Sequence, residues 1–361
     1  MKKPLLLYIL TLISLTLAAQ KVDLDRFYFT ATYIDLPRKA LDPSYRTYSV
    51  RVETGRLARM DMHNDNLENE VLIDGWRKLD AGAHIMVNTR IDDVIIEKSD
   101  IIQREEIIKD KYGKQTGSRM HYSMQLVYSF EARLNVTDFK GAVILNQQLV
   151  SRENKRTYNC TEFDSRREAE SFFRYNMVPV TSEIMNRSAT GVLQDISVML
   201  TVNYGFTQRT VNDFMWILNT RKNNESDDHK KAFLAIKDAL FQMTADQPLD
   251  KTRSLAQPAI DYFENIKKRF SSSSKSDRKM RYASYYNLAK LYYYLDDPDA
   301  AMKQATGLEL NDFDARDSKQ LEAAATDLKW LLQQSGIRTR HFPILPDQLH
   351  GPEMNAASSQ Y

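Results

Sequence analysis

The stretch from Tyr285 to Phe313 constrains the fold of this 361-residue chain more than any other. Its first half carries apolar residues three and four positions apart, the spacing that puts side chains on one face of an α-helix. These residues are Tyr285, Leu288, Ala289 and Tyr292. A helix is therefore expected to begin this stretch.

The second half of the stretch predicts a second helix that folds back on the first. Pro298 ends the first helix and suits the first turn of the next, where Asp296 or Asp297 is the expected N-cap. Small side chains at Ala301 and Ala305 would let the two helices approach closely. The stretch therefore reads as a helical hairpin.

This pattern of an aromatic, Leu-Ala, a tyrosine and two small residues resembles the tetratricopeptide repeat. It departs from that family at Ala305, where a large aromatic is usual, and at Phe313, where a proline often closes the repeat. Any helical hairpin would give similar spacing. The resemblance covers about 30 residues and implies a domain that holds a protein or peptide.

The chain from 206 to 340 is expected to form one all-helical, tetratricopeptide-like domain. Apolar periodicity predicts helices over 232–243, 255–270 and 318–334, and a short helix over 211–218. Stacked helical pairs need neighbours to bury their faces, so two or three pairs are expected, with the last helix as a cap. Residues 341–361 are proline-rich and polar, and we expect a disordered tail there.

Residues 21–205 predict a mixed α/β domain, which makes the whole chain α+β. Residues 27–54 suggest two strands around a loop. From Tyr122 to Val136 every second residue is apolar, and 142–150 would return beside it as a long antiparallel hairpin. Helices are predicted over 66–79 and 168–200, and a projecting loop or short helix over 99–118.

Two short segments of this domain resemble the periplasmic α/β module of curli-secretion-type and penicillin-binding-protein-activator lipoproteins. They are Ala81-Gly82-Ala83-His84 before a strand and Asp138-Phe139-Lys140-Gly141 within a hairpin. The resemblance is one of pattern. The lipid-anchored cysteine of those proteins is missing here, so their function does not carry over.

The segment 1–20 reads as a secretory signal peptide. Lys2 and Lys3 form a basic start, Leu5–Leu17 is apolar, and small residues at Ala18 and Ala19 precede a cleavage point. An uncleaved anchor is the alternative, although the apolar run is short for a membrane span. We expect export to the periplasm or outer envelope of a bacterium, with no transmembrane span in the mature chain.

The sequence contains no recognisable catalytic constellation, cofactor motif or metal-ligand set. The net charge of +2 does not favour nucleic acid as a partner, and the single cysteine, Cys160, cannot form an internal disulfide. Oxygen-rich runs at Asp61–Asp65 and Asp312–Asp317 fit turns and helix caps better than calcium loops. The basic segment 267–281 is either a solvated loop or a contact to an anionic surface.

A tyrosine cluster over 282–294 supplies the candidate partner-binding residues. Tyr286 and Tyr293 lie seven positions apart and so share a helix face, and Lys290 lies near them. Tyrosine is enriched at protein interfaces because it buries area and keeps a polar tip. The alternative is that these tyrosines belong to the core.

The sequence therefore predicts an exported, non-enzymatic adaptor or scaffold of the cell envelope that holds a protein or peptide partner on its helical domain. One alternative is a structural or secretion-system component that forms homo-oligomers through the 122–150 hairpin. Another is a hydrolase whose site is assembled from distant residues.

Overall fold

The computed structural model describes residues 22–61, 67–219 and 223–352, so the predicted signal peptide lies outside the described residues. Strands dominate 22–160 and helices dominate 226–335, which confirms the α+β class. Contacts divide the chain into two compact units. The helical unit comprises the described part of Met1–Ala40 with Phe206–Ile344, and the sheet unit comprises Leu41–Gly205 with the described residues from Leu345 onward.

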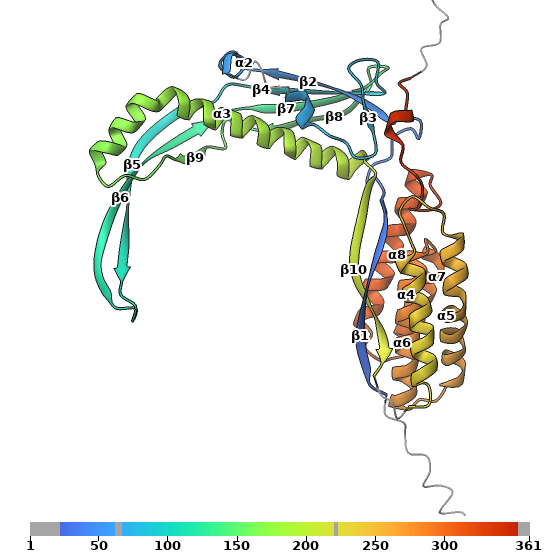
Figure 1. Ribbon diagram of the computed structural model, residues 1–361. Coiled ribbons are helices and arrows are strands. Elements are labelled where there is room, and N and C mark those ends of the chain that lie inside the picture. The colour runs from blue at the N-terminus through green and yellow to red at the C-terminus, as the bar shows by residue number, and fades with distance from the viewer. Residues whose placement is uncertain (1–21, 62–66, 220–222, 353–361) are drawn as a thin grey trace, which may run out of the picture. The chain divides into compact units, whose positions relative to one another are not determined.

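Helices α4 to α8 of the helical unit lie side by side, each packed on the next along the chain (Figure 1). Their bounds are Ser226–Phe241 for α4, Asp250–Arg269 for α5, Lys275–Tyr294 for α6, Pro298–Leu310 for α7 and Arg316–Ser335 for α8. Within the described residues this gives two helical hairpins, α4–α5 and α6–α7, followed by the single helix α8. The arrangement agrees with the pairs and final helix expected from the sequence.

The α6–α7 hairpin forms where the sequence predicted it. Asp297 is the N-cap of α7 and accepts a hydrogen bond from the Ala300 N–H at 3.0 Å, and Pro298 occupies the first turn. Close approach of the two helices depends on Gly307, because a Cβ there would lie 2.3 Å from a ring carbon of Tyr285. Both predictions for this turn, the cap and the proline position, are confirmed.

A two-stranded antiparallel ribbon covers one side of these helices. Strand β1, Leu24–Asp35, pairs with β10, Thr207–Leu218, in an unbroken register from Leu24↔Leu218 to Asp35↔Thr207. Strand β1 lies against α4, and β10 lies against α4 and α6. The side chains of Phe29, Ala31 and Met215 are buried in one core with the helices.

The predicted short helix over 211–218 is wrong, because this segment is most of β10. Pairing with β1 satisfies every second backbone group of β10, and the period-2 side chains Val211, Met215 and Ile217 pack on the helical core. The whole segment 41–205 separates the two strands in the sequence, so local periodicity could not reveal their pairing. Residues 24–35, which the sequence placed in the 21–205 domain, contact the helices instead.

The chain after α8 returns to the ribbon and the helices. The Ile34 N–H donates to the Arg340 carbonyl and the Phe342 N–H donates to the Ala245 carbonyl, both at 2.9 Å. A 3-10 turn follows at Pro346–Gln348, and Arg77 donates to the Asp347 carbonyl at 2.9 Å. Residues 341–352 of the expected tail thus have defined contacts, and 353–361 lie outside the described residues.

The sheet unit contains one sheet in the order β3-β2-β4-β7-β8. Its strands are β2 Thr47–Thr54, β3 Arg77–Lys78, β4 Ile85–Ile91, β7 Ala132–Asp138 and β8 Val143–Val150, and the short helix α2, Arg56–Asp61, follows β2. Strands β2 and β4 run parallel, whereas β4, β7 and β8 run antiparallel. Every second residue of β4 and β7 is buried.

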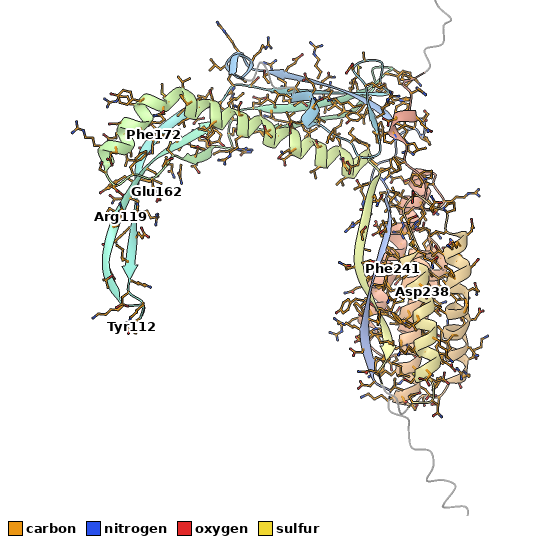
Figure 2. All side chains as sticks on the ribbon, viewed as in Figure 1. Tyr112, Arg119, Glu162, Phe172, Asp238 and Phe241 are labelled. Atoms are coloured by element: carbon orange, nitrogen blue, oxygen red, sulfur yellow. The ribbon has the colours of Figure 1, made fainter. Side chains whose placement is uncertain are left out.

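A second sheet, in the order β5-β6-β9, provides the long hairpin of this unit. Strands β5, Ile95–Lys109, and β6, Gln115–Ser129, form the hairpin, and β9, Arg156–Asn159, pairs with the end of β6. The far half of the hairpin projects beyond α3, with Tyr112 at its tip (Figure 2). We call residues 101–121 the arm.

The long hairpin is therefore not the one predicted over 122–150. The alternating run breaks at Phe130 and Glu131, so β6 belongs to the second sheet and the β7–β8 hairpin to the first. Residues 99–118, predicted as a loop or short helix, are instead two paired strands joined by a turn at 110–114. Their polar character reflects an arm that is solvated on most of its surface rather than an absence of strand.

Helix α3, Arg166–Tyr204, confirms the helix predicted over 168–200 and contacts β5 and β6. It begins with a capping box: Ser165 Oγ accepts from the Glu168 N–H at 3.2 Å and donates to the Glu168 carboxylate at 2.9 Å. A kink with non-helical dihedrals at Asn176 precedes Pro179, which lacks the N–H for the Tyr175 carbonyl.

The predicted helix over 66–79 is wrong, since of its described residues, 67–79, only the 3-10 turn Leu67–Glu70 is helical. The following residues lie along α3 in irregular structure, with a turn closed by the Trp76 N–H and the Ile73 carbonyl. The Leu72 N–H donates to Ser197 Oγ at 3.0 Å and the Asp74 N–H donates to Thr201 Oγ1 at 3.2 Å. Side chains of α3 thus supply the acceptors that the previous turn of a helix would have provided.

Candidate functional site

A cavity of about 270 Å³ lies in the helical unit between β10, α6 and α8. The three residues singled out from the sequence, Tyr286, Lys290 and Tyr293, all line it. They come from successive turns of α6, so their grouping follows directly from helical spacing. The opposite walls come from Val211–Asp213 of β10 and from the first turns of α8.

Lys290 is held inside the cavity by an ion pair. Its Nζ lies 2.7 Å and 2.6 Å from the two carboxylate oxygens of Asp213, and both side chains are less than one-fifth exposed. The Tyr294 hydroxyl donates to the same carboxylate at 2.6 Å. The positive charge of Lys290 is therefore neutralised within the unit.

The two candidate tyrosines occupy different environments. Tyr286 is buried and stacks on Phe214 of β10 with ring centroids 5.5 Å apart, so it joins the ribbon to α6. Tyr293 is partly exposed, and the guanidinium of Arg340 lies 4.6 Å from its ring centroid. Tyr286 thus belongs to the core and Tyr293 reaches the cavity surface, and a partner-binding role for either stays a prediction.

The phenols at this site are held in their neutral form. Burial, together with the nearby Asp213 carboxylate, raises the pKa of Tyr286 and Tyr294 well above the usual value. Burial, and to a smaller extent the electrostatic effect of Tyr293, raises the pKa of Tyr33 to about 12. These hydroxyls therefore act as hydrogen-bond donors and acceptors without carrying charge near neutral pH.

The outer edge of β10, which faces away from β1, is partly closed by a side chain of α6. Asn287 is fully buried; its Oδ1 accepts from the Trp216 N–H and its Nδ2 donates to the Trp216 carbonyl, both at 2.8 Å. His229 Nε2 donates to the same carbonyl at 3.1 Å. The amide of Asn287 thus bonds to Trp216 in the manner of a neighbouring strand.

Beyond Trp216 the Phe214 N–H donates to the Asp213 carboxylate at 2.8 Å, and the outer edge of β10 is open from Asn212 toward Thr210. Residues in an antiparallel pair alternate between facing the partner and facing away. The Asn219 N–H bonds to the Asp23 carbonyl, so even-numbered residues of β10 face outward, as Trp216 does. Among the described residues, the N–H and C=O groups of Thr210 and Asn212 have no backbone or side-chain partner.

Helix α8 provides the wall opposite this edge. Asp317, Gln320, Leu321 and Ala324 line the cavity from one face of the helix. Asp317 accepts from the Tyr282 hydroxyl through Oδ2 and has no ion-pair partner among the described residues. The N-cap of α8 is Ala315, so Asp312 and Asp314 do not cap the helix as the sequence suggested.

The basic segment 267–281 makes intramolecular bonds. Arg269 forms a bidentate pair with Glu225 at 2.8 Å, and Arg281 Nε donates to Asn311 at 2.8 Å. Lys267 bonds to Glu264 at 2.7 Å and lies over the Tyr285 ring. These three cations thus make contacts within the unit, residues 271–274 between α5 and α6 are exposed as in a solvated loop, and a contact to an anionic surface stays a prediction.

Two further candidates from the sequence give little. Within the described ranges, no group of three or more His, Cys, Asp or Glu side chains is placed to hold a metal ion. The run Asp61–Asp65 falls almost wholly outside them.

No helix in the part of the chain that the structure describes is long and apolar enough to cross a membrane.

Sequence reasoning missed the residues that β10 contributes to the site. Asp213 and Trp216 lie in a segment interpreted as helix, and its continuous apolar run from Phe214 to Leu218 does not distinguish a strand from a helix. Asn287 gave no signal, because a buried amide that pairs with a strand edge has no sequence signature.

A scan against models of protein families and a search of curated proteins each found no match to this chain.

Proposed function

We propose that this protein is an exported, non-enzymatic adaptor or scaffold of the cell envelope, and that its helical unit holds a protein partner at the cavity between β10, α6 and α8. The observation that carries the proposal is the open β10 edge beside this cavity. Aromatic rings and backbone hydrogen-bonding groups are available there together, the combination on which protein recognition relies. The basic start and apolar run of the segment 1–20 support export.

Site-specific photo-cross-linking of the full chain in its host cell tests this proposal. A photoreactive residue at Gln320 faces the cavity, and the same residue at the exposed Glu322 on another face of α8 is the matched control. A protein adduct is expected from position 320 and not from position 322. Adducts from neither position, or equally from both, would contradict a partner at the cavity.

A homo-oligomeric structural component is the second candidate, and one observation favours it. The arm exposes Ile107, Ile108 and Tyr112, with Tyr112 81% exposed at the tip. The outer edge of β5 has no neighbouring strand in the described residues. Exposed apolar side chains on an unpaired edge provide a surface for pairing with a second copy.

A further inference from the structure

We propose that the partner binds as an extended peptide strand that pairs with the outer edge of β10 and carries a basic side chain toward Asp317. This inference rests on the proposed function and specifies the class of partner at the same site. Its occupant is a segment of another protein.

The position of the ribbon on the helices leaves room for a third strand. Strand β1 lies on α4 and β10 lies on α4 and α6, whereas α8 packs on α6 and α7. The cavity lies where the next strand would continue this order, between β10 and α8. A strand placed there would extend the two-stranded ribbon and cover α8.

Backbone chemistry identifies the occupant as a strand. Thr210 and Asn212 present N–H and C=O groups outward at alternate residues, the pattern that an added strand satisfies. At Trp216 the amide of Asn287 already fills this role, which shows that the edge accepts hydrogen bonds in this direction. Asn287 at Trp216 and the Asp213 carboxylate at the Phe214 N–H close one end of the edge.

The opposite end of the cavity is bounded by the loop after β1. Arg38 donates to Asp327 at 2.6 Å, and Gln334 donates to the Arg38 carbonyl at 2.8 Å, so this loop lies across the second half of α8. The open part of α8 runs from Asp317 to Ala324. At about 1.5 Å per helical residue this length accommodates three to four residues of a strand.

Charge complementarity indicates which side chains fit. Three charged residues line the cavity, and two of them, Lys290 and Asp213, neutralise each other. Asp317 is left with a negative charge that no cation among the described residues pairs. A lysine or arginine of the peptide would supply this missing cation. Leu321, Ala324 and Tyr293 favour an apolar side chain beside it, on the same face of the strand.

Panning a random heptapeptide display library on the full chain is the first test. We expect enrichment of peptides with a lysine or arginine two residues from an apolar side chain. In the enriched peptide, N-methylation of the backbone at alternate residues should weaken binding about tenfold, and methylation at the intervening residues should not. A lack of enrichment, or sensitivity without this alternation, would overturn the proposal.

Two proline variants locate the paired edge. Asn212→Pro removes an outward N–H without breaking the β1–β10 ladder, and Thr30→Pro, at the residue that pairs with Asn212, makes the same change on the opposite edge of the ribbon. Binding should fall about tenfold in Asn212→Pro alone. Asp317→Asn should weaken binding of the basic peptide. Binding of an analogue that has norleucine at the basic position should not change. Equal effects of the two proline variants would contradict strand addition at β10.

Other occupants give different results. A full chain that is dimeric in light scattering and becomes monomeric with Asn212→Pro would assign the edge to a second copy. Peptide binding that appears only after deletion of residues 353–361 would assign it to the chain's own end. Either result overturns this inference. A cross-link at Gln320 with no effect of Asn212→Pro would leave the proposed function standing and remove only the strand-addition mode.

Discussion

Buried polar side chains determine how the ribbon attaches to the helices. Asn287 and His229 both bond to Trp216, so one residue of β10 is fixed by α6 and α4 at once. His229 is 1% exposed, and its Nδ1 has no hydrogen-bond partner among the residues that the structure describes. A second proton on this ring would therefore be buried without an acceptor.

The stability of the protein should depend on pH through His229. Burial lowers its pKa from 6.5 to about 4, so between these values the unfolded chain binds more protons than the folded chain. Above pH 6.5 the ring is neutral in both states and does not lower the free energy of unfolding. As pH falls toward 4, this free energy decreases by about 3 kcal/mol. Urea unfolding across this range measures it.

His229→Gln keeps a donor for the Trp216 carbonyl and cannot titrate. We expect this variant to lose less stability than the original chain between pH 6.5 and 4. The exposed His350 gives a control, since His350→Gln should retain the original pH dependence. An unchanged pH profile in His229→Gln would show that the buried ring is not responsible.

Sequence reasoning was most successful at residues whose partners lie on the same element or the adjacent one. Tyr286, Lys290 and Tyr293 share a helix, so their common lining of one cavity follows from spacing. Asp213, the partner of Lys290, is 77 residues away and lies on a strand that pairs with β1. Such contacts depend on tertiary pairing, which carries no local periodic signal.

At the scale of elements, the predictions failed where neighbours rather than local pattern supply the backbone hydrogen bonds. The α6–α7 hairpin and α3 satisfy their own amides, and both were predicted. Leu72 and Asp74 bond to α3 side chains and β10 bonds to β1, and both segments were misread as helix. The arm was missed because its strands are polar on most of their surface.

The arm provides a test of the second candidate function. Deleting Arg104–His121 and closing Gln103 to Tyr122 with Asn-Gly shortens the hairpin and leaves the Tyr122–Phe163 bridge in place. If the arm pairs copies, light scattering should show an oligomer for the full chain and a monomer for the shortened chain. Ile107→Lys with Ile108→Lys, in a full-length arm, should also yield a monomer. A full chain that remains monomeric at high concentration rules out this route.

Each of the two units buries hydrophobic side chains of its own, and among the described residues those of the helical unit form three clusters. In the helical unit, the buried pair Arg340–Asp296, with 2.6 Å between Nε and Oδ1, joins the segment after α8 to the α6–α7 turn. Arg340 also lies over the ring of Tyr33 at 4.1 Å. Removal of one partner would leave a buried charge without compensation.

Calorimetry should therefore show two unfolding transitions. Asp296→Ala should destabilise the helical unit by about 3 to 5 kcal/mol and lower one transition. Thr47→Val removes buried hydrogen bonds to His84 in the sheet unit and should lower the other by about 1 to 3 kcal/mol. A single transition that both variants shift equally would indicate that the units unfold together.

The pairing of β1 with β10 has a consequence for the order in which this protein matures. Strand β1 is synthesised first, yet its partner strand is synthesised only after the segment 41–205 of the sheet unit. Until then Phe29 and Ala31 lack the core that buries them. Because contacts so distant along the chain form slowly, closure of the ribbon is expected to be a late and slow step of folding. During that interval the nascent N-terminal strand is the segment most exposed to aggregation and most dependent on protection by chaperones.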